Sequence, residues 1–94
     1  MNVAFALPAV AGLEQASALV RDVDAAIAAA TGDTVVLDAA ALTEFDTSAV
    51  ALLLHAQRAA RARDLKLEVR GAPPKLLELA RLYGVHELLA LESG

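Results

Sequence analysis

Residues 34–55 read TVVLDAAALTEFDTSAVALLLH, and this stretch joins two different hydrophobic patterns. Residues 34–38 form a short β-branched and apolar run, which is typical of a buried strand. From residue 47 onward the apolar stretch is long enough for a helix, which we expect over residues 47–63. The joint carries three residues of the types preferred as helix N-caps, namely Asp46, Thr47 and Ser48. Because a helix start needs only one cap, we expect the surplus side chains to serve function.

The predicted helix has two opposite faces when its residues are spaced at about 100°. The core face collects small and apolar residues, namely Ala49, Leu53, Ala56 and Ala60. On the opposite side we expect an exposed ridge, flanked by Val50 and formed by Thr47, Ala51, Leu54, Arg58 and Arg61. An exposed leucine two turns from a hydroxyl at the positive helix end indicates a docking surface.

The N-terminal third predicts a strand and a helix. Residues 2–7 are apolar and precede Pro8, so we expect a strand there and a connection over residues 8–12. Residues 13–30 show apolar positions at intervals of three and four, which indicates an amphipathic helix. Gly32 is expected to end this helix in a left-handed conformation. The expected core positions of the helix are Leu13, Ala16, Val20, Val23, Ile27 and Ala30.

The C-terminal third repeats this order. Asp64 is expected to turn the chain, and residues 65–70 alternate apolar with charged side chains, which predicts a strand near a sheet edge. Pro74 is placed to open a last helix, which Gly84 should end. The expected core stripe of that helix is Leu76, Leu79, Ala80 and Tyr83. Residues 85–91 form a short apolar tail, helical or extended.

A strand followed by a helix, repeated three times, is the pattern of an α/β domain. With 94 residues the chain has the length of one domain. We therefore expect a single domain over residues 1–94. Its sheet should be mainly parallel or mixed, with about three to four strands, and should carry about three to four helices.

The composition excludes several classes of function. The chain has no cysteine, so disulfides, thiol chemistry and zinc–cysteine sites are ruled out. A formal net charge of −4 argues against nucleic acid as the main partner. Charged residues interrupt every apolar run before it reaches the ~18–20 residues of a membrane span. We expect a cytoplasmic protein without a membrane span.

Catalytic motifs are not found either. The five glycines do not form a phosphate-binding loop. His55 and His86 lack the spacing of a metal site, and His55 is expected to be a solvated helix residue. Asp38 closes a strand, as the acceptor of a receiver domain would, but no acidic residue ends the first strand. We therefore expect Asp38 to organise its loop, and we expect neither enzymatic activity nor a cofactor or metal.

A phosphate on Thr47 would change binding more than folding. It would bring about −1.5 to −2 charges and three acceptor oxygens. The helix start favours such a group, because its free N–H groups and dipole attract anions. An apolar partner on Val50 and Leu54 would instead have to desolvate it. Since a hydroxyl at a helix start is also a common cap, the sequence leaves both a switch and a structural role open for Thr47.

The stretch around the joint resembles the STAS domain family, whose members are small α/β domains. The resemblance rests on the strand over residues 35–38 and on residues 45–50, which read FDTSAV and open a helix. It continues through residues 65–69 and 74–77. In that family the helix start reads Asp-Ser/Thr-Ser/Thr/Gly-Gly-Leu, and the first hydroxyl after the aspartate is the regulatory phosphorylation site.

By this resemblance Thr47 is the phosphorylation site, and Ser48 is a weaker candidate. The chain departs from the family at the two following positions, where Ala49 and Val50 replace glycine and leucine. It also offers only residues 2–7 for the strands that usually precede the first helix, so we expect a shortened sheet.

Two functions compete within that family, and both are binding functions without cofactors. One is the anti-sigma factor antagonist, which binds a kinase-like anti-sigma factor and is released when phosphorylated. The other is the MlaB-type subunit, which binds the ATPase of a phospholipid-transporting ABC complex and so lies at the inner membrane through its partner. Thr47, residues 52–55 and residues 79–85 resemble the second more closely, which we therefore expect.

In either case the resemblance implies a protein partner docked on the helix start and the ridge. The expected partner-binding residues are Asp46, Thr47, Ser48, Val50, Ala51, Leu54 and Arg58. An interaction domain whose Thr47 is never modified remains as a further alternative.

Overall fold

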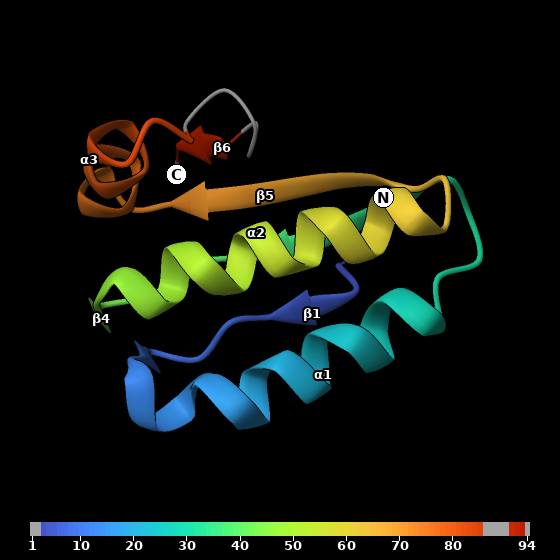
Figure 1. Cartoon of the computed structure of the whole chain (residues 1–94), viewed down its shortest axis with the longest axis horizontal. Coiled ribbons are helices and arrows are strands. Elements are labelled where there is room, and N and C mark those ends of the chain that lie inside the picture. Colours follow the sequence, from blue (N-terminus) through green and yellow to red (C-terminus); the bar gives the residue numbers. More distant parts are fainter. Residues whose placement is uncertain (1–2, 86–90, 94) are drawn as a thin grey trace.

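A parallel β-sheet carries the helices in the computed structural model, which describes residues 3–85 and 91–93 (Figure 1). In chain order the elements are β1 (Phe5–Ala6), β2 (Val10–Ala11), the 3-10 turn η1 (Leu13–Gln15), α1 (Ala16–Ala28), β3 (Thr34–Asp38), β4 (Glu44–Phe45), α2 (Thr47–Ala62), β5 (Lys66–Ala72), α3 (Pro74–Leu82) and β6 (Leu91–Ser93). The α/β class predicted from the sequence is confirmed.

The main sheet has the strand order β1-β3-β5-β6, and all neighbouring strands in it are parallel. Val35 lies opposite Leu67 and Leu37 opposite Val69, so the buried positions of β3 and β5 are in register. β5 lies between β3 and the edge strand β6, which agrees with its predicted place near a sheet edge. Its alternation of charged and apolar residues reflects a sheet that is covered on one face.

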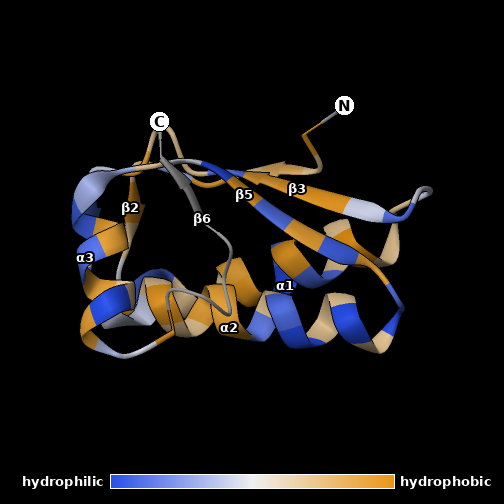
Figure 2. Cartoon of the chain, turned by 90° about the horizontal axis from the view of Figure 1, so that it is seen from above, coloured by the Kyte–Doolittle hydropathy of each residue, from blue (hydrophilic) through white to orange (hydrophobic). Residues whose placement is uncertain are grey.

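α1 and α2 lie side by side on one face of the main sheet (Figure 2). The core forms between these helices and the sheet. Val35 and Leu37 from β3, Val69 from β5, Ile27 from α1 and Leu53 from α2 belong to it, and each is at most 2% exposed.

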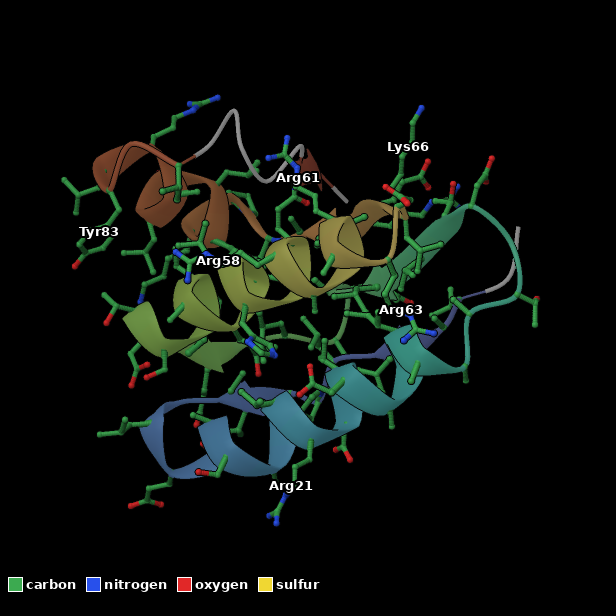
Figure 3. All side chains as sticks on the ribbon, turned by 45° about the vertical axis from the view of Figure 1, so that its right-hand side comes forward. Arg21, Arg58, Arg61, Arg63, Lys66 and Tyr83 are labelled. Carbon is green, nitrogen blue, oxygen red and sulfur yellow. The ribbon has the colours of Figure 1, made fainter. Side chains whose placement is uncertain are left out.

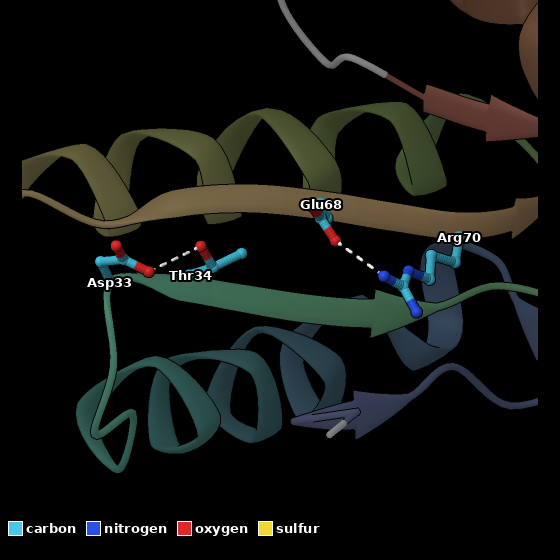
Figure 4. A network of polar contacts seen from close by, with 4 residues as sticks. All are labelled: Asp33, Thr34, Glu68 and Arg70. Atoms are coloured by element: carbon cyan, nitrogen blue, oxygen red, sulfur yellow. Dashed lines mark hydrogen bonds and ion pairs between the residues drawn. The ribbon is translucent and has the colours of Figure 1, made fainter. Parts of the chain in front are cut away.

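The strands turn polar side chains away from the helices. On β5, Arg70 Nη2 donates to Glu68 Oε2 at 3.3 Å, and at the start of β3 the Thr34 hydroxyl donates to Asp33 Oδ1 at 3.0 Å (Figure 4). Polar contacts of this kind, at least partly open to solvent, add little to stability. The charged positions of β5 alternate with its core positions because successive side chains of a strand point to opposite faces of the sheet.

A second, two-stranded parallel sheet pairs β2 with β4. Residues 8–12 were expected to be only a connection, but they hold the segment that precedes α2, with Val10 opposite Glu44 and Ala11 opposite Phe45. Strands of two residues are too short for an alternating pattern to reveal them in the sequence.

The loop from β3 to α2 is fixed at both ends. At its start Asp38 Oδ1 accepts a hydrogen bond from the Ala40 backbone N–H at 2.9 Å, so the predicted loop-organising role of Asp38 is confirmed. Gly71 passes close to this turn with φ +68, and a Cβ on it would lie 2.9 Å from the Ala40 Cβ. At the far end the backbone N–H groups of Thr43 and Glu44 both donate to the Ala9 carbonyl at 2.9 Å.

α1 begins after the 3-10 turn rather than at residue 13. A 3-10 turn has about three residues per turn, so the α-helical phase that placed Leu13 on the core face does not extend to it. Leu13 is 76% exposed, and its prediction as a core residue is wrong. The buried residues of α1 are Leu19, Val23 and Ile27, of which Leu19 was not predicted.

Left-handed residues follow α2 and α3 but not α1. Asp64, which was predicted to turn the chain, has φ 58 after α2, and Gly84, which was predicted to end the last helix, has φ 71 after α3. α1 instead ends through Ala29 in a right-handed conformation, and Gly32 lacks the positive φ expected of it. Gly32 lies too far beyond Ala28, the last helical residue, to act as the C-terminal glycine of the helix.

α3 begins at Pro74, as predicted, and buries Leu76 and Ala80. Tyr83 lies just past the helix and is 54% exposed, so its prediction as part of the core stripe is wrong. Of the predicted tail over residues 85–91, residues 86–90 lie outside the described residues, and with them His86; Leu91 begins β6.

Candidate functional site

Asp46 is the residue that caps α2. Its backbone is extended, and its Oδ1 accepts a hydrogen bond from the Ser48 backbone N–H at 2.8 Å. Its Oδ2 accepts a second hydrogen bond from the Leu13 backbone N–H at 3.3 Å. One carboxylate thus satisfies a free N–H group of α2 and ties the helix start to the 3-10 turn before α1.

These hydrogen bonds favour the ionised form of Asp46. The backbone N–H of Ser48 contributes most, followed by the Ser48 hydroxyl, and together with the Leu13 N–H they hold the pKa of the Asp46 carboxyl below its ordinary value. Asp46 therefore carries a full negative charge at neutral pH, beside the positive end of the helix dipole.

The Thr47 side chain takes no part in this cap. Thr47 is exposed at the first helical position, and within the part of the chain that the structure describes no hydrogen bond reaches its hydroxyl. Of the three capping candidates in the sequence, Asp46 makes the cap, Ser48 contributes its N–H and hydroxyl to Asp46, and Thr47 remains available.

Thr47 lies at one end of an open groove between α2 and the end of α3. The groove has a volume of about 380 Å³ and is lined by Thr47, Val50, Ala51, Leu54, Tyr83 and Val85. Five of these six side chains are aliphatic or aromatic, so the groove is apolar with a hydroxyl at its edge. We call it the α2–α3 groove.

Val50 and Leu54 connect the groove to the core. Val50 is only 4% exposed and belongs to the core, but its edge lines the groove beside Thr47, Ala51 and Leu54, so it flanks the ridge as predicted. Leu54 is half-buried and packs against the core, whereas Ala51 is exposed. The ridge is therefore fully exposed at Thr47, Ala51, Arg58 and Arg61 and half-buried at Leu54.

The backbone at the end of α3 fixes the opposite wall of the groove. Gly84 N–H donates to the Arg81 carbonyl at 3.0 Å, and Val85 N–H donates to the Ala80 carbonyl at 2.9 Å. This pair of bonds is a Schellman motif, which requires the left-handed conformation that Gly84 adopts. The motif holds Tyr83 and Val85 on either side of Gly84, where both face α2 across the groove.

The other flank of α2 differs in character. Ser48 is half-buried and lines a hollow of about 270 Å³ between α1 and α2, together with Leu13, Ala16, Val20, Ala51, Leu52 and His55. We call it the α1–α2 hollow. The imidazole Nε2 of His55 lies 2.6 Å from Asp24 Oδ1 on α1. His55 was predicted to be a solvated helix residue, but in the structure it also links the two helices.

Arg58 and Arg61 continue the ridge beyond the groove. Both are exposed, and neither forms an ion pair with any residue that the structure describes. They project from α2 toward the side on which α3 lies, whereas Arg21 projects from α1 at the opposite edge of the molecule (Figure 3). The groove at the start of α2 is thus apolar, and beyond it the same helix carries two arginines that form no ion pair with a described residue.

The structure brings together most of the residues that the sequence singled out. Thr47, Val50, Ala51 and Leu54 share the groove, and Arg58 follows on the same face. Asp46 and Ser48 lie outside it and serve the helix cap. Tyr83 and Val85, which form the second wall, were not predicted from the sequence. Gly84 between them was the available signal, because residues next to a helix-ending glycine no longer follow the spacing of the helix.

Neither a metal centre nor a membrane span is visible in residues 3–85 and 91–93. No group of three or more acidic, histidine or cysteine side chains there is arranged to hold a metal ion. No helix in this part of the chain is both long and apolar enough to cross a bilayer.

Comparisons with known proteins agree with this architecture. A family model described as "Mlab, STAS domain" matches residues 4–90. Among solved structures, an anti-sigma-factor antagonist (STAS) domain protein from Planctomyces limnophilus superposes with a TM-score of 0.79, at 16% sequence identity, over 95% of this chain and 80% of that one. No curated protein matches the chain. Because the family model covers almost the whole sequence, this chain belongs to the family of MlaB-type STAS domains.

Proposed function

We propose that this protein is a regulatory binding domain, the STAS subunit that binds the ATPase of an Mla-type phospholipid-transporting ABC complex. It would act in the cytoplasm and reach the inner membrane only through that partner. STAS domains are generally non-enzymatic and mediate protein–protein contacts, which supports a binding role. The match to the MlaB-type family model favours the transporter over other assignments.

The observation that carries the proposal is the exposed hydroxyl of Thr47, which makes no hydrogen bond with a described residue and lies beside an apolar groove. A partner that fills the groove with apolar side chains would bury the edge of Thr47. A phosphate there would add about −1.5 to −2 charges at the contact and would have to be desolvated. The domain itself would tolerate the phosphate, since the helix start attracts anions and the cap belongs to Asp46.

The same arrangement supports a second candidate, an anti-sigma factor antagonist. Its partner would be an anti-sigma kinase that docks on the α2–α3 groove and phosphorylates Thr47. The feature that this function requires is the exposed hydroxyl of Thr47, to which no described residue forms a hydrogen bond. A third candidate is an interaction domain that binds through the groove and is never modified.

The experiment is a binding measurement with purified candidate partners from the source organism. An Mla-type ATPase and an anti-sigma kinase are each titrated with wild type, Thr47→Glu and Thr31→Glu, by isothermal calorimetry. Thr31 is exposed and lies after α1, so its variant adds the same charge away from the groove. We expect the ATPase to bind wild type and Thr31→Glu alike, and Thr47→Glu at least about tenfold more weakly.

Two further results separate the candidates. The free energy of unfolding of Thr47→Glu should stay within about 0.5 kcal/mol of wild type, because the substitution lies at an exposed helix start. Binding to the kinase instead of the ATPase would assign the sigma-regulatory function. Equal binding of Thr47→Glu and wild type would contradict the groove as the binding site, and intact-mass analysis of the protein from its own cells would show whether Thr47 is modified.

A further inference from the structure

The spacing of the ridge is that of a helix–helix seam. Its five residues, Thr47, Ala51, Leu54, Arg58 and Arg61, follow one another at intervals of four, three, four and three. This alternation gives the average of about 3.5 residues that keeps one line of side chains against a second helix. Leu54 stands at the centre of the line as a half-buried side chain, and exposed Ala51 beside it leaves room for close approach.

The seam also changes chemistry along its length. At the start of α2 it borders the α2–α3 groove, where Tyr83 and Val85 add apolar surface. About three turns after Thr47 it reaches Arg58, followed by Arg61, and neither arginine makes an ion pair with any described residue. The whole chain has a formal net charge of −4, so these two arginines form a local positive patch on an acidic protein.

From these features we infer that the element docked on α2 is an amphipathic helix of the partner, with apolar residues in the α2–α3 groove and acidic residues opposite Arg58 and Arg61. The inference rests on the proposed binding function and adds the chemistry of the partner. The rise of about 1.5 Å per residue places the two acidic side chains roughly 4–11 residues from the apolar ones along that helix.

The orientation follows from the helix dipoles. The acidic residues of the partner helix lie opposite the end of α2, where the dipole of α2 is negative. An acidic turn is most favourable at the positive N-terminal end of its own helix. The partner helix therefore runs antiparallel to α2, with its acidic turn first and its apolar residues after it. Docking of this kind is the helix-in-groove mode of recognition.

The test uses two synthetic peptides of about 18 residues, long enough for measurable helicity. The acidic peptide has two glutamates on its seam near the N-terminus and three leucines on the seam after them; in the basic peptide lysines replace the glutamates. Each is titrated into ¹⁵N-labelled full-length protein and followed by the backbone amide shifts. We expect the acidic peptide to shift the amides of Ala51, Leu54 and Arg58 and to bind about tenfold more tightly than the basic one.

Charge reversal provides the matched control. In the double variant Arg58→Glu/Arg61→Glu the preference should invert, so that the basic peptide binds more tightly. Arg21→Glu, which changes an exposed arginine on α1, should leave the preference unchanged. Equal affinity of the two peptides, absence of binding by both, or shifts confined to the α1–α2 hollow would each overturn the inference.

Other occupants of the seam give distinct results. If a second copy of the chain covers it, sedimentation of the wild-type protein alone shows a dimer that Leu54→Asp dissociates, and the inference is wrong. If the purified ATPase binds but its binding is insensitive to Arg58→Glu/Arg61→Glu, the proposed function stands and the acidic helix does not. If the peptides behave as expected but no candidate partner binds, the surface assignment stands and the proposed partner is wrong.

Discussion

Two neighbouring hydroxyl residues, Ser48 and Thr47, lie in opposite environments on the two flanks of α2. On the side of α1, Ser48 is half-buried, gives its N–H to Asp46 and lines the α1–α2 hollow beside the His55–Asp24 contact. On the side of α3, Thr47 is exposed and borders the α2–α3 groove. A rotation of about 100° between adjacent helical residues is enough to separate them. One flank packs α2 against α1, and the other borders the open groove that we propose as the binding surface.

The largest expected effect is on the free energy of unfolding, when one leucine on each flank is replaced by alanine. Leu52 is 4% exposed and faces the α1 side, whereas Leu54 is half-buried on the groove side. Leu52→Ala should lower the free energy of unfolding by about 2–5 kcal/mol, because it leaves a cavity in the core. Leu54→Ala should lower it by only about 1 kcal/mol, since less apolar surface is lost. Urea unfolding followed by circular dichroism measures both.

The binding effects should run in the other order. At a temperature where both variants remain folded, Leu54→Ala weakens partner binding and Leu52→Ala does not. Similar losses of stability in the two variants would show that the groove side belongs to the core, and the contrast between the flanks would fail.

A smaller effect is expected on the pKa of Asp46. Ser48→Ala removes the Ser48 hydroxyl contact and should raise the pKa of the Asp46 carboxyl toward its ordinary value, while Thr47→Ala should leave it unchanged. A carbon-detected NMR titration of the carboxylate measures the pKa in each variant. An equal rise in both would mean that Thr47 shares in the cap.

The same contact fixes the pH dependence of stability. Because the folded-state pKa of Asp46 is lowered, its contribution to the free energy of unfolding is present above the ordinary pKa of an unfolded aspartate and is lost as the pH falls through the folded value. In Ser48→Ala the folded pKa lies nearer the unfolded one, so the contribution is smaller and its loss is complete at a higher pH. Urea midpoints between pH 2 and 6 would show this for wild type and both alanine variants.

The smallest effect is expected at the link between α1 and α2. His55 and Asp24 are 2.6 Å apart, but their side chains are 41% and 50% exposed. Asp24→Asn should therefore change the free energy of unfolding by less than about 1 kcal/mol and leave partner binding unaltered. Asp22→Asn on the same helix is the control, since exposed Asp22 makes no ion pair with a described residue. A loss of binding in Asp24→Asn alone would place the docking surface on the α1 flank.

The regular elements were predictable because their hydrophobic patterns are long or bounded by strong signals. The strand over residues 34–38, the helix that begins at Thr47 and the helix that begins at Pro74 all follow from local sequence. The capping set at the joint predicted where α2 starts, but three chemically similar candidates stood there. Only the hydrogen bonds of Asp46 in the folded chain assign the cap.

The failures share a physical cause, since each depends on residues distant in sequence or on a change of helical phase. Leu13 does not lie on the core face because it belongs to the 3-10 turn that precedes α1, and Tyr83 does not because α3 ends before it. The short pairing of β2 with β4 joins segments more than 30 residues apart. The groove is predictable on one wall only, since nothing in the local pattern relates Tyr83 to Thr47.

Gly71 shows how the groove depends on a residue outside it. Any side chain at this position would meet Ala40 at the start of the loop that leads to Thr47, and its positive φ adds strain for every other amino acid. In a saturation mutagenesis library selected for partner binding, position 71 would therefore be as depleted as the groove positions. A parallel selection for folded protein would separate them, because position 71 would be depleted there too, whereas Thr47 would accept most substitutions.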